Sequence, residues 1–458
     1  MQQTKKTVDM TEGPFFKKML VFAIPIVLTG ILQCLYNAAD LVVVGQFRGD
    51  LAVAAVGSTG SLTNLILGLF MGLSVGAGVC VAHHVGAKEP DELSKVVHTS
   101  VLLSLFCGIA IAAVGFFLSG DMLALMDTPP EVLPLATLYM KILFLGVPAS
   151  MLYNYIAAMM RSAGDSKHPL IFLAISGVVN VVLNVFLIVV FDMGVDGVAV
   201  ATIASQYLSA GMAVVHLMRK GGVLHLSVRE LRIHGAKVKK MLHIGIPSGL
   251  QSMLFSLSNV LIQSSINSFG DAVVAGSAAS ASIEGFMYIA MNSMYHVALT
   301  FIGQSVGARK YKNIKPLSIY SAILVTAIGF ISGALLLGLR YPLISLYVST
   351  EASTEAALQR LWIIGSTYFL CGLMEVFCGA LRALDRSVTS MIISLCGACG
   401  LRILWIETIF RAFPAPETIY LSYPVSWILT LAFQLLFTVL VSKQMIRRHN
   451  SEHAEAIS

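Results

Sequence analysis

Residues 19–44 read MLVFAIPIVLTGILQCLYNAADLVVV, an apolar run whose single charged residue is Asp40. A helix needs about 20 apolar residues to cross a bilayer core about 30 Å thick, so this run predicts a transmembrane helix. Barrel strands are about 10 residues long and alternate in polarity, a pattern that the run lacks. Eleven further apolar runs follow, so the sequence predicts twelve transmembrane helices. The predicted spans are residues 19–44, 51–80, 95–118, 134–158, 168–190, 196–218, 241–267, 272–300, 316–338, 357–380, 388–410 and 419–442.

The composition is that of a membrane protein. Of the 458 residues, 57% are hydrophobic and 12% are charged, and the mean hydropathy is +0.82. Soluble proteins carry about 25% charged residues, so a soluble enzyme is excluded and the lipid bilayer is the first expected partner. The basic residues are scattered without an aromatic platform, so we expect no nucleic-acid partner. The chain has no GxxxxGK(S/T) phosphate loop, so we expect no direct coupling to ATP.

The distribution of lysine and arginine predicts the orientation, because short cytoplasmic loops collect these residues. If residues 1–18 lie in the cytoplasm, 24 of the 30 lysines and arginines fall on cytoplasmic segments. We therefore expect both termini inside the cell. The first apolar run is too long for a signal peptide and lacks a small-residue cleavage site, so we expect it to stay attached.

The chain contains an internal repeat at a spacing of 221 or 222 residues. The repeated pairs are Ile24-Pro25 with Ile246-Pro247, Asn37 with Asn259, Gly49-Asp50 with Gly270-Asp271, Val85–Lys88 with Val306–Arg309, and Arg161 and Ser166 with Arg382 and Ser387. Such repeats are typical of transporters that bind substrate between two halves. Each half contains six of the twelve predicted spans. Because six is even, the chain returns to its starting side after the first half, so both halves enter the membrane from the same side.

This repeat predicts an all-α polytopic membrane protein with two pseudo-twofold-related six-helix bundles. The predicted organisation is a cytoplasmic N-terminal segment (1–18), an N-lobe (19–218), a basic cytoplasmic linker (219–240), a C-lobe (241–443) and a cytoplasmic tail (444–458). Pro25 and Pro247 lie early in the first helix of each half, where each removes a backbone hydrogen bond. A structural kink and a moving hinge are both consistent with that position. Gly76 ends a GxxxGxxxG ridge that would let a neighbouring helix approach closely.

A polar stripe surrounds the acid of the first helix. An intramembrane acid normally faces a cavity, a partner or a proton path. The first, fifth and sixth spans carry polar residues at helical spacing, namely Gln33, Tyr36, Asn37 and Asp40, then Ser176, Asn180 and Asn184, then Thr202, Ser205, Gln206 and Ser209. If these three faces converge, Asp40 could carry a proton or help to hold Na⁺ through oxygen ligands. The alternative is ordinary hydrogen bonding between helices.

The second half carries a different set of polar residues. Glu284, Tyr288 and Asn292 share one face of a helix, with Met291 nearby, and the preceding span contributes Asn259. An acid beside tyrosine and methionine suits an amphipathic organic cation; for the methionine, packing is the alternative.

Other charged residues lie in or near the spans. Lys141 and Arg360 lie near outer helix ends and are expected to reach the interface. The sequence assigns no role to Glu375, Arg402 or Glu407.

Together these residues resemble the multidrug and toxic compound extrusion (MATE) family over residues 14–445. The matching features include Pro25, Asn37 and Asp40, the inner loops Gly86–Lys88 and Gln304–Arg309, Arg161-x-x-Gly164-Asp165-Ser166, Asn180, and Gly197–Thr202. The DinF-like prokaryotic branch is the most similar. The resemblance implies export of cationic or amphipathic compounds in exchange for H⁺ or Na⁺ across the prokaryotic inner membrane.

Within that branch, the resemblance implies a coupling cluster at Asp40, Asn180 and Thr202, with Asn37 beside it. Asn184 departs from the branch, which usually has an aspartate there. One carboxylate in place of two favours a proton, although Na⁺ could still bind at Asp40, Asn180, Asn184 and Thr202. Gln33, Tyr36, Gln206, Asn259, Glu284, Tyr288, Met291 and Asn292 are the candidate substrate-binding residues.

The predicted function is thus a secondary antiporter and not an enzyme, working as a monomer without a cofactor. A flippase for lipid-linked oligosaccharides is the first alternative, but it would need a basic cavity for pyrophosphate. A membrane prenyl transferase is the second, but it would need clustered carboxylates for Mg²⁺. The in-span acids are scattered, which counts against the second alternative.

Overall fold

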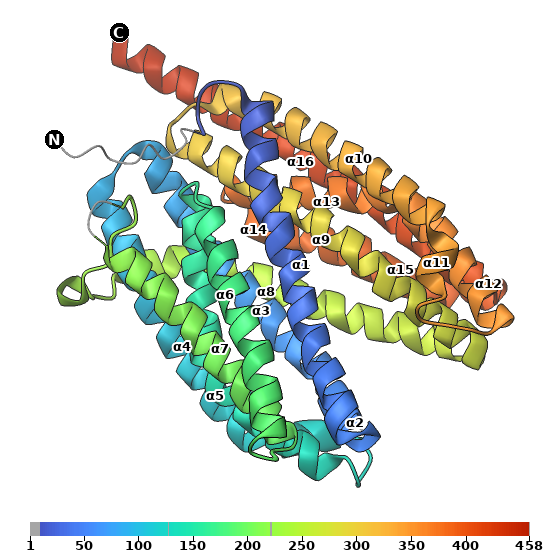
Figure 1. The fold of residues 1–458 in the computed structure, drawn as a ribbon. Helices are drawn as coiled ribbons and strands as arrows, with labels where there is room; N and C mark the ends of the chain where they lie inside the picture. The colour runs from blue at the N-terminus through green and yellow to red at the C-terminus, as the bar shows by residue number, and fades with distance from the viewer. Residues whose placement is uncertain (1–9, 127, 220–221, 458) are drawn as a thin grey trace. The chain divides into compact units, whose positions relative to one another are not determined.

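A computed structural model describes residues 10–126, 128–219 and 222–457 (Figure 1). The described residues form helices joined by short loops, without a β-strand. This confirms the predicted all-α fold. The side chains of 37, 50, 61 and 453–457 lie outside the description.

The helices have the following bounds. They are α1 (Phe15–Arg48), α2 (Asp50–Ser58), α3 (Gly60–Ala87), α4 (Pro90–Ala124), α5 (Leu133–Ser162), α6 (Lys167–Val189), α7 (Val195–Met218), α8 (Gly235–Asn267), α9 (Asp271–Gly307), α10 (Ile314–Gly338), α11 (Arg340–Ile344), α12 (Glu351–Arg360), α13 (Ser366–Ala383), α14 (Ser387–Ser394), α15 (Leu401–Trp405) and α16 (Pro416–Ile457).

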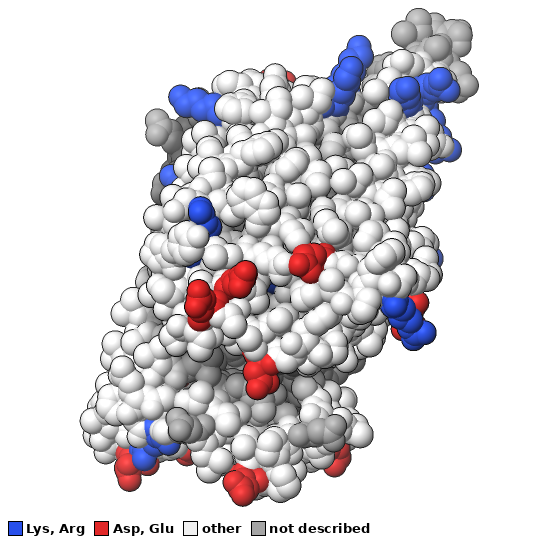
Figure 2. All heavy atoms as spheres, turned by 90° about the vertical axis from the view of Figure 1, so that its right-hand side faces the viewer, with Lys and Arg blue, Asp and Glu red and all other residues white. Residues whose placement is uncertain are grey.

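Most of the predicted spans are helices suited to a membrane. Among the described residues, eleven helical stretches are long and apolar enough to cross a bilayer. The predicted span 241–267 is also helical, within α8, but Gln251, Asn259 and Gln263 lower its hydropathy. Large apolar side chains are exposed on these helices, including Phe117 at 78% and Ile331 at 70%. Most of the face drawn in Figure 2 is uncharged, and a few acidic side chains lie across its middle.

The chain forms two compact units. Residues 28–245 make up the first, and residues 10–27 with 246–457 make up the second. Two helices pass from one unit to the other, α1 after Val27 and α8 after Gly245. Pro25 and Pro247, which are buried inside these helices, lie within three residues of the two crossings.

The backbone reproduces the internal repeat. Left-handed φ angles are rare in residues other than glycine. In this chain they recur at positions 221 residues apart. The pairs are Gly49 (+76°) with Gly270 (+88°), Lys88 (+58°) with Arg309 (+55°), and Gly164 (+99°) with Asp385 (+60°). The same turn geometry therefore ends equivalent helices in both halves.

Glycine allows two helices of the first unit to touch. A Cβ atom on Gly76 of α3 would lie 2.1 Å from the backbone oxygen of Met241, and one on Gly245 would lie 2.7 Å from that of Leu73. Both distances are shorter than any real contact, so a side chain at either position would push α8 away from α3. The prediction that the glycine ridge permits close approach is confirmed at Gly76.

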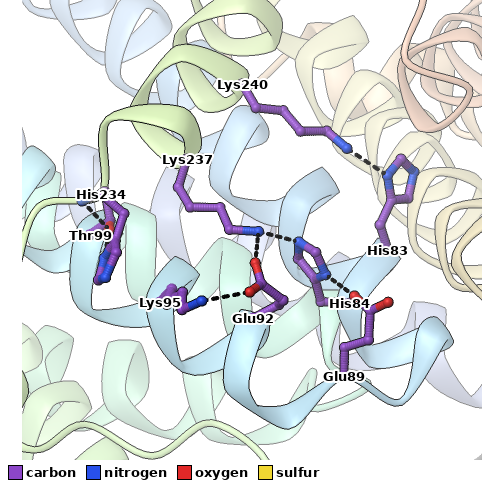
Figure 3. A network of polar contacts seen from close by, with 9 residues as sticks. All are labelled: His83, His84, Glu89, Glu92, Lys95, Thr99, His234, Lys237 and Lys240. Carbon is purple, nitrogen blue, oxygen red and sulfur yellow. Dashed lines mark hydrogen bonds and ion pairs between the residues drawn. The ribbon is translucent and has the colours of Figure 1, made fainter.

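The basic segment before α8 is attached to the first unit. Leu224 and Leu226 are buried, and the backbone N–H of Ser227 donates to Nε2 of His98 at 3.0 Å. At the start of α8, Nζ of Lys237 lies 2.6 Å from Glu92 Oε2 (Figure 3). The described part of the predicted linker is therefore packed against α3 and α4.

Figure 3 shows that this network continues along α3 and α4. Lys237 Nζ also lies 2.9 Å from Nε2 of His84, whose Nδ1 contacts Glu89. Lys95 donates to Glu92 at 2.7 Å. These contacts anchor the first turns of α8 before the helix passes into the second unit.

Residues 10–27 belong to the second unit. Met10 and Met19 are buried there, and the rings of Phe22 and Phe301 meet edge to face at 5.8 Å. Nδ2 of Asn313 donates to the backbone oxygen of Thr11 at 2.9 Å. Thus α1 packs on α9 through Phe22, and the residues before α1 contact the turn before α10.

Candidate functional site

Asp40 lies where α1, α6 and α7 meet, and only 5% of the residue is exposed. Nδ2 of Asn184 donates to its Oδ1 at 2.6 Å, and Oγ1 of Thr202 donates to its Oδ2 at 3.0 Å. Among the described residues, no lysine or arginine forms an ion pair with this carboxylate. The condition set by the sequence analysis, that the three polar stripes meet around Asp40, is therefore met in the structure.

Asn180 joins the two donors into one network. Its Oδ1 accepts from Asn184 Nδ2 at 3.2 Å, and its Nδ2 donates to Thr202 Oγ1 at 3.4 Å. Asn180 and Asn184 are four residues apart on α6, so both side chains share one helix face. Both are completely buried. The amides therefore hold α1, α6 and α7 together around the acid.

The Thr202 hydroxyl can serve both protonation states of Asp40. It has a single hydrogen and lies 3.0 Å from Asp40 Oδ2 and 2.9 Å from the backbone oxygen of Val198. A hydroxyl can donate once and accept twice. When Asp40 is ionised, Thr202 donates to it; when Asp40 is neutral, Thr202 accepts from it and donates to Val198. No heavy atom has to move between the two states.

Asp40 faces a cavity of about 350 Å³ inside the first unit. The predicted residues Gln33, Tyr36 and Gln206 line it, and the Tyr36 hydroxyl donates to the backbone oxygen of Thr202 at 3.3 Å. Among the described lining residues, Asp40 is the only one with a formal charge. The cavity is thus a mainly apolar space with one negative group in its wall.

Three helices without a predicted site residue also line the cavity, and α2 contributes Val56. Helix α3 supplies Thr63 and Asn64, and α5 supplies Tyr139, Phe144 and Asn154. The available signal was the presence of these amides and hydroxyls within apolar spans. Their number is small, and spacing alone does not place them opposite Asp40.

Two buried acceptors near the cavity have no hydrogen-bond partner among the described residues. These are Oδ1 of Asn184 and Oε1 of Gln206. Asn184 directs its nitrogen to Asp40, so its oxygen would join an Na⁺ ligand set with Asp40 and Thr202 only after the amide rotates. The residues around Asp40 therefore suit a proton in the arrangement observed, and they suit Na⁺ once the Asn184 amide has rotated. The predicted contribution of Asn37 lies outside the described side chains.

Glu284 has a different environment from the one its sequence suggested. Its two carboxylate oxygens accept from Nε and Nη2 of Arg360 at 3.0 and 2.9 Å, and both residues are about 5% exposed. The expectation that Arg360 reaches the interface is wrong, because the buried acid holds it inside the unit. Glu284 is therefore already neutralised by a partner.

The other predicted residues of the second unit are spread over different environments. Met291 is buried in the core, while Tyr288 is 42% exposed and accepts from Asn292 at 3.5 Å. Asn259 is exposed on α8. Their role in binding a substrate stays a prediction.

The sequence matches the MatE family model in two segments, residues 25–186 and 247–406. The chain belongs to the MatE (MATE) family. The two segments begin at Pro25 and Pro247, so the family match follows the internal repeat. Members of this family are membrane transporters and not enzymes, which confirms the predicted class and excludes the intramembrane transferase.

Curated relatives cover most of the chain. The "Probable multidrug resistance protein YoeA" of Bacillus subtilis is 25% identical over 409 residues, 88% of each chain. The "Multidrug export protein MepA" of Staphylococcus aureus is 23% identical, over 86% of this chain and 88% of its own. The "FAD transporter" of Shewanella oneidensis is 23% identical, over 84% and 86%.

Solved structures share the fold. One is described as the "Outward-facing conformation of a multidrug resistance MATE family transporter of the MOP superfamily" and has a TM-score of 0.90 at 19% identity. The match covers 97% of this chain and 100% of the chain in that structure. A MOP superfamily transporter from Pyrococcus furiosus, reported with a binding pocket of reverse polarity, has a TM-score of 0.86 at 20% identity, over 98% of each chain.

Proposed function

We propose that this protein is a secondary antiporter that exports cationic or amphipathic organic compounds in exchange for H⁺. Asp40 is the residue that carries the proton. The observation that carries the proposal is a buried carboxylate, held by neutral donors from two other helices, in the wall of an otherwise uncharged cavity. Na⁺ is the alternative coupling ion, and the experiment below distinguishes the two.

The cavity supports a cationic substrate. Tyr36, Tyr139, Phe144 and Tyr153 supply aromatic surface, and Met140 supplies an adaptable thioether. Two of the relatives above carry multidrug names. A flavin dinucleotide or a lipid pyrophosphate would need basic groups, and the described lining contains none. The flippase alternative is therefore less favoured than cation export.

The mechanism follows from the charge of Asp40. The ionised carboxylate attracts a cation to the cavity, and protonation removes that attraction and favours release. A ligand can shift a conformational equilibrium only through different affinities for the two states. Pro25 and Pro247 lie beside the points where α1 and α8 pass between the units. We assign them as the hinges of alternating access.

The cellular setting follows from the charge distribution and the relatives. We place the protein in the bacterial cytoplasmic membrane with both termini inside, because the basic loops cluster on one side of the predicted topology. It works as a monomer, without ATP or a bound cofactor.

The test is efflux of a fluorescent organic cation from proteoliposomes under separate H⁺ and Na⁺ gradients. Wild type should respond to the H⁺ gradient, and Asp40→Asn should fall to the level of protein-free vesicles. Glu407→Gln is the matched control, because Glu407 is an exposed in-span acid paired with Arg411. Full H⁺-driven efflux by Asp40→Asn would remove Asp40 from the mechanism.

The Asn184→Asp variant tests the choice of ion. A second carboxylate beside Asp40 should create a site with enough charge to hold Na⁺ and make efflux respond to an Na⁺ gradient. If wild type already follows the Na⁺ gradient alone, the proton assignment is wrong. Movement of a fluorescent pyrophosphate lipid, without cation efflux, would instead establish the flippase.

A further inference from the structure

A group of potential metal ligands lies outside the Asp40 site, where α6 begins and α7 ends. It consists of Asp165, His168 and His216, all partly buried. One ligand atom of each residue lies within 4.8 Å of those of the other two. Asp165 Oδ2 is 2.6 Å from Nδ1 of His168 and 3.9 Å from Nε2 of His216. One carboxylate oxygen therefore faces both imidazoles.

The local backbone holds this group in place. Gly164 has a φ of +99°, which turns the chain after α5 and brings Asp165 to the start of α6. Oδ1 of Asp165 accepts the backbone N–H groups of Lys167 and His168, each at 3.2 Å. This leaves Oδ2 for the imidazoles. His216 lies in the last turn of α7, and its ring centroid is 4.2 Å from that of His168.

The chemistry of the group fits a transition metal. Two imidazole nitrogens and one carboxylate oxygen are a common three-ligand set for Zn²⁺, which leaves a fourth position for water. In a tetrahedral site with metal–ligand bonds of about 2.1 Å, neighbouring ligand atoms lie roughly 3.4 Å apart. This value falls between the distances of 2.6 and 3.9 Å from Asp165 Oδ2 to the two imidazole nitrogens. Imidazole favours Zn²⁺, Cu²⁺ and Ni²⁺ over Mg²⁺ or Ca²⁺.

We propose that Asp165, His168 and His216 form a binding site for a divalent transition-metal ion of the Zn²⁺ class. The ion ties the first turn of α6 to the last turn of α7. These helices also carry Asn184 and Thr202, so the metal restrains the helix pair that holds Asp40 without touching the acid.

The test uses Co²⁺ as a spectroscopic substitute for Zn²⁺ on the full-length protein, purified in detergent with a tag that contains no histidine. Wild type should bind one Co²⁺ per chain with the visible absorption of a low-coordinate nitrogen and oxygen site, and Zn²⁺ should displace it. His168→Gln and His216→Gln should each weaken binding by about 100-fold or more, because a direct ligand contributes more than an outer-shell partner, whose loss costs about 10- to 100-fold. His243→Gln, at an exposed histidine of α8, should bind as wild type does.

A second variant separates loss of a ligand from loss of structure. His216→Cys keeps a metal ligand, so it should still bind one ion and should shift the preference toward Cd²⁺. Thermal unfolding without metal should be the same for all variants. The proposal is overturned if wild type shows no specific Co²⁺ absorption, or if both glutamine variants bind as tightly as wild type. The readout is bound metal per chain, so failure leaves the transport proposal unaffected.

Discussion

Asp40 in the first unit and Glu284 in the second are both carboxylates with 5% exposure inside membrane helices. Asp40 is held by an amide and a hydroxyl, whereas Glu284 is held by the guanidinium of Arg360 through two hydrogen bonds. The same degree of burial therefore accompanies two different electrostatic environments. The partner, and not the burial, indicates which acid can change its charge.

The physical reason lies in the cost of an unpaired buried charge. A guanidinium keeps its charge at any accessible pH, so Glu284 has to stay ionised to neutralise Arg360. The neutral donors around Asp40 impose no such requirement, and Thr202 can bond either protonation state. We therefore expect Glu284 to act in stability and Asp40 to act in transport.

The sharpest test of this comparison is transport by the two acid-to-amide variants. Asp40→Asn should abolish H⁺-driven cation efflux, while its stability should stay within about 1 kcal/mol of wild type because the amide can still bond Thr202. Efflux in proteoliposomes and thermal unfolding in detergent measure the two effects. Full loss of folding in Asp40→Asn would mean that Asp40, too, is mainly structural.

Breaking the Glu284–Arg360 pair should give the largest loss of stability. Removing one partner of a buried ion pair costs about 3–5 kcal/mol, because the other charge is left uncompensated. Arg360→Met and Glu284→Gln should therefore each unfold at a much lower temperature. The double variant should regain most of the loss, since no charge stays buried. Additive losses in the double variant would contradict a direct pair.

Thr202→Val should have an intermediate effect. It removes the hydroxyl next to Asp40 Oδ2 and leaves a buried acceptor without a donor, which costs about 1–3 kcal/mol. H⁺-driven efflux should fall by about tenfold or more, while Thr202→Ser, which keeps the hydroxyl, should restore it. Equal activity of the valine and serine variants would show that the hydroxyl takes no part in coupling.

The exposed pair Arg48–Asp192 should show the smallest effect. Its atoms lie 2.8 Å apart, but the side chain of Asp192 is 91% exposed. Exposed pairs contribute less than about 1 kcal/mol, so Asp192→Asn should change neither stability nor efflux measurably. Asparagine also tolerates the left-handed φ of +56° at this residue. A large effect would mean that distance predicts the importance of a pair better than burial does.

Much of the fold could be predicted from the sequence because it depends on local spacing. Apolar run length predicts the spans, and the 221-residue repeat predicts turns that recur in the backbone, such as those at Lys88 and Arg309. Helical spacing also predicted that the polar residues of α1, α6 and α7 share one face of each helix, although their convergence on Asp40 was only a condition at that stage.

The rest was decided by tertiary packing. Nothing local to Glu284 names Arg360, which lies 76 residues away, and nothing in α5 places Tyr139 in the wall of the Asp40 cavity. Likewise, nothing in the basic cytoplasmic linker predicts that Leu224 and Leu226 are buried. Periodicity determines which face of a helix is polar, but only the packing of helices distant in the sequence determines what that face meets. The sequence therefore determined the helices and the position of Asp40, whereas the tertiary structure decided that Asp40 has neutral partners and Glu284 a charged one.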